Sequence, residues 1–304
     1  MRNAFSDVIY EIGRKNKKIC ALVADISPAG SIVKFREEFP ERFINTGVAE
    51  QAMIGIAAGL ALKGMRPFCY TIATFSLYRP FEMIRVDLCY QNLPVTIIGM
   101  GAGVIYSTLG STHHSMEDIA IASAIPNMTV LAPCDPSEMR IMTEWCATQS
   151  NGPVYMRLGK AGEPDLTVDA IEDLVVGKIR YLEKGKDIAL ISYGIALNMV
   201  KKLANQLKAA GKSVSVISCH TIKPLDSEGI KMMLHEHKDV VVIEEHVPHG
   251  GLSSRVKEIA WDSQASCGLR TYTLKDEFIH CYGTYEELLK AHGISLEEIL
   301  KELS

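Results

Sequence analysis

The chain has 304 residues, enough for about two domains of ordinary size. Its 32 Lys and Arg residues against 36 Asp and Glu residues give a formal net charge of −4, which argues against a general nucleic-acid or anionic-membrane binder. The 23 Gly and 12 Pro residues are ordinary frequencies, and they exclude collagen-like and low-complexity chains.

The cysteines and the uncharged segments bear on the compartment. The eight cysteines form no C-x-x-C pair, and most lie in apolar runs, which indicates reduced core thiols in a cytoplasmic protein rather than a zinc site. Residues 1–18 are amphipathic and charged, unlike a signal peptide. Residues 88–116 lack charged side chains, but their polar residues and glycines favour a buried, ligand-facing segment over a membrane span.

In the first half of the chain, short apolar or β-branched runs predict strands, and the segments between them have helical periodicity. The predicted strands are 19–25, 42–45, 67–73, 94–100, 128–133 and 153–158. The predicted helices are 3–15, 31–38, 49–63, 77–90, 115–124 and 136–149. The last of these helices has a clear beginning, because Asp135 can cap it and Pro136 occupies its first position.

Residues 160–185 are charged and lose this alternation, so we interpret them as a connection. The alternation then resumes with strands 188–193, 213–220, 240–245 and 270–274 and helices 196–210, 226–237, 251–262 and 284–303. Such alternation implies βαβ units. We therefore predict two doubly wound α/β domains with mostly parallel sheets, at residues 1–160 and 186–304, joined by a linker at 161–185.

Ligands of such sheets bind beyond the carboxyl ends of the strands, so the loops there are the places to look for chemistry. Glu50 lies in the first of these loops, at the start of a helix whose small apolar body must be buried. Its carboxylate can complement the helix dipole. Alternatively, a carboxyl group withdrawn from water can share a proton with a ligand nitrogen. The periodicity leaves both explanations open.

The second loop, residues 101–118, holds His113 and His114 in an uncharged, glycine-rich stretch. Two adjacent histidines can serve capping or packing, but such a loop also suits a polar substrate. The preceding G-M-G-A-G run does not predict a dinucleotide site, because Val104 stands where the fingerprint needs glycine.

Phe75 and Tyr78 follow the third predicted strand and lie one helical turn apart. Aromatic side chains at this spacing can be core residues or a platform for a cofactor. The spacing alone favours the core.

Four blocks of the sequence resemble the transketolase family. Residues 43–75, with G-V-A-E-Q, and residues 111–139, with T-H-H, resemble its pyrimidine-binding domain. Residues 218–226 and 240–254 resemble the C-terminal domain shared by transketolase, deoxyxylulose-phosphate synthase and the β subunits of 2-oxo-acid dehydrogenases. The resemblance covers nearly the whole chain and implies a thiamine-diphosphate-binding fold followed by a transketolase C-terminal domain.

The family's Gly-Asp-Gly motif, which binds Mg²⁺ and the diphosphate, does not occur in this sequence, and the chain begins directly at the pyrimidine domain. The resemblance therefore implies the C-terminal subunit of a split transketolase. A separate N-terminal subunit would carry the pyrophosphate and Mg²⁺ site, with no metal ligand in this chain. Because the cofactor lies between the two kinds of domain in this family, we expect an α2β2 heterotetramer in which this chain also pairs with itself. We expect neither a nucleic-acid nor a membrane partner.

The resemblance also implies roles for individual residues. Glu50 would be catalytic, through a hydrogen bond to N1′ of the aminopyrimidine of thiamine diphosphate. Phe75 and Tyr78 match aromatic residues that stack on the pyrimidine or flank it, and an apolar wall there would withdraw the carboxyl group from water. His113 matches the active-site histidine that contacts the oxygens of the donor. His114 stands where many members have glutamine, and we expect it to bind substrate as well.

Two cations are candidates for a substrate phosphate. Lys160 lies near the position of a phosphate-binding arginine in relatives, although a lysine supplies only a point charge. Arg157 is the other candidate, unless it is a structural residue at the end of its strand. Leu109 replaces the acid that reads a donor hydroxyl in typical transketolases, so we expect another donor than the usual pentulose phosphate, or another way of reading its hydroxyl.

The implied reaction of carbohydrate metabolism transfers a two-carbon ketol unit from a ketose or ketose phosphate to an aldose. Three alternatives remain open. A β-type subunit of a 2-oxo-acid dehydrogenase would need a lipoyl-domain partner, and a deoxyxylulose-phosphate synthase is normally one chain. A non-catalytic regulatory or binding subunit would restore activity to no partner.

Overall fold

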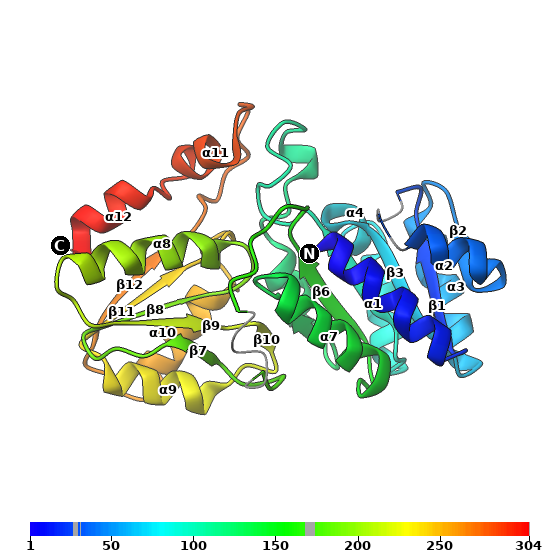
Figure 1. The fold of residues 1–304 in the computed structure, drawn as a ribbon, viewed down its shortest axis with the longest axis horizontal. Helices are drawn as coiled ribbons and strands as arrows, with labels where there is room; N and C mark the ends of the chain where they lie inside the picture. The colour runs from blue at the N-terminus through cyan, green and yellow to red at the C-terminus, as the bar shows by residue number, and fades with distance from the viewer. Residues whose placement is uncertain (27–29, 31, 168–173, 304) are drawn as a thin grey trace.

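Two β-sheets organise the protein, in a computed structural model that describes residues 1–26, 30, 32–167 and 174–303. One sheet has seven strands in the order β10-β5-β6-β4-β3-β1-β2, and the other has five in the order β12-β11-β8-β9-β7. Helices cover the faces of both sheets, and the sheets form two α/β domains that lie next to each other (Figure 1). The predicted fold class is confirmed.

The seven-stranded sheet is parallel except at one edge. Its six parallel strands coincide with the six strands predicted for the first half of the chain: β1 Ile19–Val23, β2 Phe43–Asn45, β3 Arg66–Ile72, β4 Thr96–Met100, β5 Thr129–Leu131 and β6 Val154–Leu158. The seventh strand, β10 (Thr221–Lys223), comes from the second half of the chain and runs antiparallel to β5. A strand was not predicted there.

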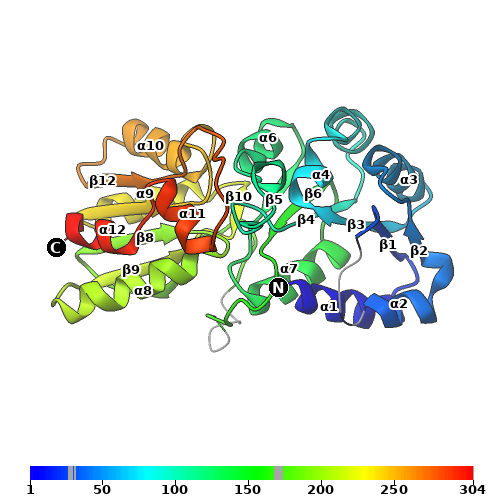
Figure 2. The same cartoon turned by 90° about the horizontal axis from the view of Figure 1, so that it is seen from above.

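Helices pack on both faces of this sheet (Figure 2). Alternate residues of β1 show the two faces: Cys20 and Leu22 belong to one apolar cluster, and Ile19, Ala21 and Val23 belong to the other. The first cluster includes α3 (Glu50–Leu62) and α6 (Asp118–Ala124). The second includes α1 (Arg2–Lys15), α2 (Ile32–Glu38) and α7 (Pro136–Thr148).

Two of the predicted helices are interrupted. The segment predicted as one helix at 77–90 follows α4 (Ala73–Leu77) and consists of α5 (Phe81–Met83) and the π-helix η2 (Ile84–Tyr90). Pro80 lies at the break. Because proline has no N–H to donate to the preceding turn, it interrupts the helix. The segment predicted at 284–303 is divided into α11 (Tyr285–Ala291) and α12 (Leu296–Leu303), because Gly293 adopts φ +85°.

The five-stranded sheet follows the same plan. Its parallel strands are β8 Ile188–Ser192, β9 Val214–Ser218, β11 Asp239–Ile243 and β12 Gly268–Tyr272, and its remaining helices are α8 Ala196–Ala209, α9 Ser227–Glu236 and α10 Leu252–Asp262. An unpredicted fifth strand, β7 (Arg180–Glu183), pairs antiparallel with β9 inside the predicted connection. Part of that connection, 168–173, lies outside the described residues. No described helix is long and apolar enough to cross a membrane.

Candidate active site

A cavity of about 450 Å³ lies beyond the carboxyl end of β3. Its lining combines residues that the sequence singled out with others that it did not: Thr74, Phe75, Tyr78, Arg79, Ser111, Thr112, His114, Glu117, Ile121 and Phe278. A cavity of about 560 Å³ beside Cys89 and Pro126 is larger, but its lining includes none of the predicted site residues. The first cavity is therefore the candidate active site.

Glu50 is the first residue of α3 and only 3% exposed. The chain turns into this helix at Gly47, whose φ of +66° is open to glycine without steric cost, and the side-chain oxygen of Asn45 accepts a hydrogen bond of 2.9 Å from the Gly47 N–H. The apolar body of α3 packs against the sheet, with Met53 and Ile54 fully buried. The Glu50 carboxylate is thus buried, but the expectation that the whole helix is buried was wrong, because a second face of α3, with Ile56 and Leu62, is exposed.

Arg79, which the sequence did not single out, is the partner of this carboxylate. Its Nη1 lies 3.0 Å and 3.1 Å from the two carboxylate oxygens of Glu50. Its guanidinium carbon also lies 4.0 Å from the ring centroid of Phe75, in cation–π contact. The Arg79 side chain is 42% exposed, so the ion pair is open on the arginine side. The sequence feature that could have identified Arg79 is its position as a single cation directly after Phe75 and Tyr78.

His113 ends the short 3₁₀ helix η3 (Ser111–His113) and contacts the same aromatic residue. Its ring stands edge-on to Phe75, with the centroids 5.3 Å apart, and edge-on to Tyr106 at 6.1 Å. Partial burial, assisted by the charge of Arg79, lowers the pKa of His113 below its usual value. The neutral imidazole is therefore favoured at pH 7.

His114 lines the cavity and is 4% exposed. Burial lowers the pKa of His114, while the backbone of Tyr106 acts in the opposite direction. Within the described part of the chain, neither ring nitrogen has a hydrogen-bond partner of regular geometry. Buried polar atoms without partners cost free energy, so this imidazole is suited to a ligand that supplies them.

Tyr78 lines the cavity but directs its hydroxyl to the protein. The phenol oxygen lies 2.9 Å from a carboxylate oxygen of Glu117 and 3.1 Å from the hydroxyl of Ser115. Burial raises the pKa of Tyr78, so the phenol remains protonated and donates to Glu117. The structure brings both predicted aromatic residues, Phe75 and Tyr78, to the cavity.

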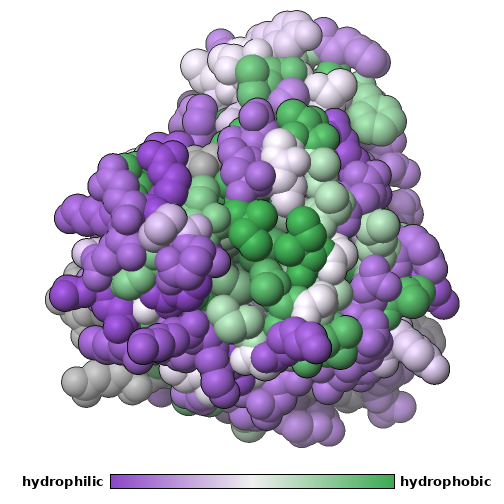
Figure 3. Space-filling view, turned by 90° about the vertical axis from the view of Figure 1, so that its right-hand side faces the viewer, coloured by the Kyte–Doolittle hydropathy of each residue, from purple (hydrophilic) through white to green (hydrophobic). Residues whose placement is uncertain are grey.

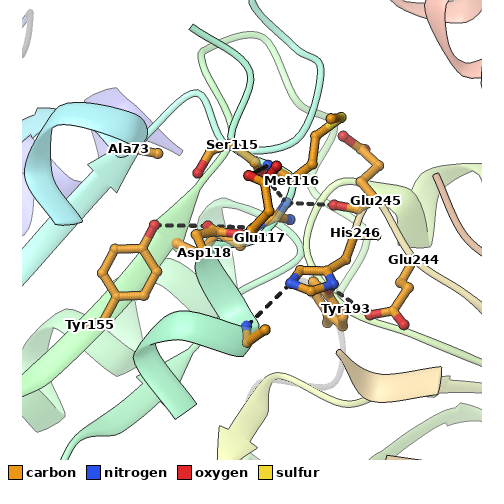
Figure 4. A network of polar contacts seen from close by, with 12 residues as sticks. Ala73, Ser115, Met116, Glu117, Asp118, Tyr155, Tyr193, Glu244, Glu245 and His246 are labelled. Atoms are coloured by element: carbon orange, nitrogen blue, oxygen red, sulfur yellow. Dashed lines mark hydrogen bonds and ion pairs between the residues drawn. The ribbon is translucent and has the colours of Figure 1, made fainter. Parts of the chain in front are cut away.

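Arg157 lies elsewhere, in a polar network between the two domains. It is 4% exposed, its Nε lies 2.9 Å from a carboxylate oxygen of Asp118, and its Nη2 donates to the backbone oxygen of Glu245 at 2.8 Å. The hydroxyl of Tyr155 donates to Asp118 at 2.8 Å (Figure 4). These bonds occupy the guanidinium, which favours the structural alternative for Arg157.

Lys160 is exposed, and its Nζ lies 5.2 Å from the ring centroid of Tyr106. Tyr106 also contacts His113, so Lys160 lies beside a ring that packs against this histidine. The residues described by the structure contain no group of three or more His, Cys, Asp or Glu side chains placed to hold a metal ion.

Family comparisons agree with this fold. The family model of the transketolase pyrimidine-binding domain matches residues 1–162, and that of the transketolase C-terminal domain matches residues 177–299. The chain therefore belongs to the transketolase family. The pyrimidine-binding domain of this family implies thiamine diphosphate as the cofactor.

Similar proteins narrow the identification. One subunit of the apulose-4-phosphate transketolase of Phocaeicola vulgatus is 33% identical over 300 residues, covering 99% of this chain and 95% of that protein. A 6-deoxy-6-sulfo-D-fructose transketolase subunit of Clostridium sp. is 32% identical over 302 residues, covering 99% and 92%. A solved split-gene transketolase, an inactive β4 tetramer, superimposes with a TM-score of 0.86 at 33% identity, covering 99% of this chain and 95% of that one. This chain corresponds to the C-terminal subunit of a split transketolase, a component of a heteromeric transferase.

Proposed function

We propose that this chain, together with a separate N-terminal subunit, transfers a two-carbon ketol unit from a ketose or ketose phosphate to an aldose. The observation that carries the proposal is the buried Glu50 carboxylate, whose ion pair with Arg79 borders a cavity that is also lined by the buried imidazole of His114, which makes no hydrogen bond of regular geometry. The two subunits would act in the cytoplasm. Most cysteines of this chain are buried and none forms a disulfide among the described residues, as expected of reduced thiols in that compartment.

The residues present fit the pyrimidine end of thiamine diphosphate. When bound, the cofactor supplies a nucleophilic carbon and an electron sink for breaking a carbon–carbon bond. Glu50 would hold a proton at N1′ of the aminopyrimidine, and the Phe75 ring would pack against the pyrimidine. The half-exposed Arg79 would have to leave the carboxylate when the pyrimidine arrives. One half-exposed side chain can make this exchange without repacking the core.

The two histidines and Lys160 suit a sugar substrate. Because burial lowers the pKa of both His113 and His114, each is neutral at pH 7 and can exchange hydrogen bonds with sugar hydroxyls. Lys160 would supply a point charge for a phosphate. Arg157 is not assigned to substrate binding, since its donors are engaged with Asp118 and Glu245.

The partner would complete the site. We propose that the N-terminal subunit holds Mg²⁺ and the diphosphate, and that the assembly is α2β2. Exposed apolar side chains of Val48, Ile56 and Leu62 lie on or beside α3, and Figure 3 shows apolar side chains gathered on this end of the molecule. Such a face supports self-pairing of this chain. The similar solved transketolase, a β tetramer that is inactive, supports both self-association and the need for a partner.

The donor would differ from the usual pentulose phosphate. Leu109 is 47% exposed, and its side chain has no polar atom to accept a hydrogen bond from a donor hydroxyl. The similar subunits named for apulose 4-phosphate and 6-deoxy-6-sulfofructose support a donor of unusual structure.

The test begins with a pull-down: this chain is used as bait to capture its partner subunit from native lysate, in the presence of thiamine diphosphate and Mg²⁺. The reconstituted complex is then assayed for ketol transfer to ribose 5-phosphate from four ketoses: xylulose 5-phosphate, fructose 6-phosphate, apulose 4-phosphate and 6-deoxy-6-sulfofructose. Transfer from at least one ketose is expected, with xylulose 5-phosphate the poorer donor. Acyl transfer to a lipoyl domain instead would identify a 2-oxo-acid dehydrogenase subunit, and failure to activate any partner would indicate a non-catalytic subunit.

A further inference from the structure

The segment from Lys275 to Gly283, between β12 and α11, belongs to the C-terminal half of the chain, yet its Phe278 lines the candidate active site. We propose that this segment forms the substrate wall of the cavity and that Phe278 determines which ketoses are accepted. The inference rests on the proposed ketol transfer, because it assigns a specificity residue to that reaction.

The segment is tied directly to the loop that carries the histidines. The hydroxyl of Ser111 donates to the backbone oxygen of Ile279 at 2.5 Å. One residue earlier, Gly110 adopts φ +81°, and a Cβ there would lie only 2.9 Å from the ring of Tyr282. A side chain at Gly110 would therefore displace the Tyr282 ring. Figure 1 shows the orange loop before α11 rising beside the blue-green loop that precedes α6.

The two ends of the segment are also anchored. The Tyr285 hydroxyl donates to one carboxylate oxygen of Glu245, and the other oxygen of Glu245 lies 3.4 Å from the backbone N–H of Val104, which donates to it. At the other end, the backbone N–H of Lys275 donates to Nδ1 of His292 at 3.1 Å. These contacts fix the two ends of the segment whose Phe278 lines the cavity.

Phe278 is free to meet a ligand. Its side chain lines the cavity, yet the residue is 67% exposed, unlike an ordinary core phenylalanine. An exposed ring at a cavity edge offers an apolar face to the carbon skeleton of a sugar, while His114 and Thr112 supply polar contacts. Phe75 lies on α4, and Arg79 directly follows Tyr78. Arg79 is the partner of Glu50, and its guanidinium contacts the Phe75 ring. Phe278 is therefore assigned to the substrate and not to the cofactor.

The test uses the reconstituted enzyme with the four ketoses named above. Phe278→Ala is compared with Phe278→Leu, which restores apolar bulk, and with Trp261→Ala, which removes an 85% exposed aromatic side chain from α10, away from the cavity. We expect Phe278→Ala to lower kcat/KM for the preferred ketose on the order of tenfold, mainly through KM, and to change the ranking of the ketoses. Phe278→Leu should recover most of the loss, and Trp261→Ala should behave as wild type.

Two further readouts separate the explanations. Thiamine diphosphate affinity, from a calorimetric titration, and subunit assembly, from light scattering, should be unchanged in Phe278→Ala. Unchanged ketose ranking and KM, a loss of cofactor affinity, or a loss of assembly would each overturn the inference, the last by making Phe278 an interface residue. If the wild-type complex transfers from none of the ketoses, the proposed function itself fails.

Discussion

Several buried carboxylates of the described residues pair with an arginine, and two of these pairs, Asp118–Arg157 and Glu50–Arg79, differ in how they are enclosed. Asp118 and Arg157 have side chains 0% and 4% exposed, and Arg157 also donates to the Glu245 backbone. Glu50 is 3% exposed, but the Arg79 side chain is 42% exposed and rests against the Phe75 ring. The first pair is closed, and the second is open on one side.

The difference in enclosure distinguishes an ion pair with a structural role from one at the candidate active site. The closed pair joins α6 and β6 to the loop after β11, so it fastens one domain to the other. The open pair holds a buried carboxylate with a cation that water or a ligand can replace. A buried charge pair contributes little net stability, but removing one partner is costly where nothing replaces it. The two pairs should therefore respond differently to the same substitution.

The largest effect is expected at the closed pair. Arg157→Met leaves the Asp118 carboxylate buried and without its cation, and the free energy of unfolding should fall by about 3–5 kcal/mol, measured by urea denaturation. The control is Arg270→Met, because Arg270 pairs with Asp239 near the surface, where less than about 1 kcal/mol is expected. Similar losses in the two variants would show that the Asp118 pair is not closed.

Acid should act on the same junction through His220. Its backbone oxygen accepts a hydrogen bond from the Ala132 N–H, and burial, with the charge of Arg180, lowers the pKa of His220 to about 4. Because the unfolded state has the ordinary pKa of about 6.5, it binds the proton first, and stability falls as the pH drops from 6.5 towards 4.

The loss attributable to His220 is about 2 kcal/mol between pH 7 and pH 5. His220→Gln should remove that part of the pH dependence, as measured by unfolding at both pH values. His249→Gln, at an exposed site, is the control. Equal pH dependence in wild type and His220→Gln would contradict the assignment.

The smallest effect on stability is expected at the open pair. Arg79→Met should cost about 1 kcal/mol, because water in the cavity can solvate the Glu50 carboxylate. It should also tighten thiamine diphosphate binding by the assembled complex a few-fold, since a competitor for Glu50 is gone. Denaturation and calorimetry check both effects. A loss as large as that of Arg157→Met, with no gain in affinity, would remove the distinction between the two pairs.

Much of the fold could be predicted from the sequence, because strands buried on both faces have continuous apolar runs. The two missed strands lack that signal. Arg180–Glu183 has charged residues at its ends and pairs at a sheet edge, and Thr221–Lys223 has only three residues and precedes a proline. Their positions depend on partners distant in the sequence, which periodicity does not contain.

The site was less predictable. Glu50, Phe75 and the two histidines were identified by their resemblance to the family, and the structure brings them to one region. Arg79 was missed as a partner of Glu50, and Phe278 was missed entirely, because each reaches the site through tertiary contacts. Arg157 was a candidate cation for a substrate phosphate, with a structural role at the end of its strand as the alternative, and only the structure shows its partner Asp118.

The central claim is that Glu50 serves the cofactor in a complex with a separate N-terminal subunit. The most direct measurement is kcat for ketol transfer by the reconstituted complex carrying Glu50→Gln, with Glu82→Gln, an exposed glutamate paired with Arg85, as the control. We expect Glu50→Gln to assemble normally and to lose kcat on the order of a hundredfold or more, with the control unchanged. Wild-type kcat in a fully assembled Glu50→Gln complex would contradict the account.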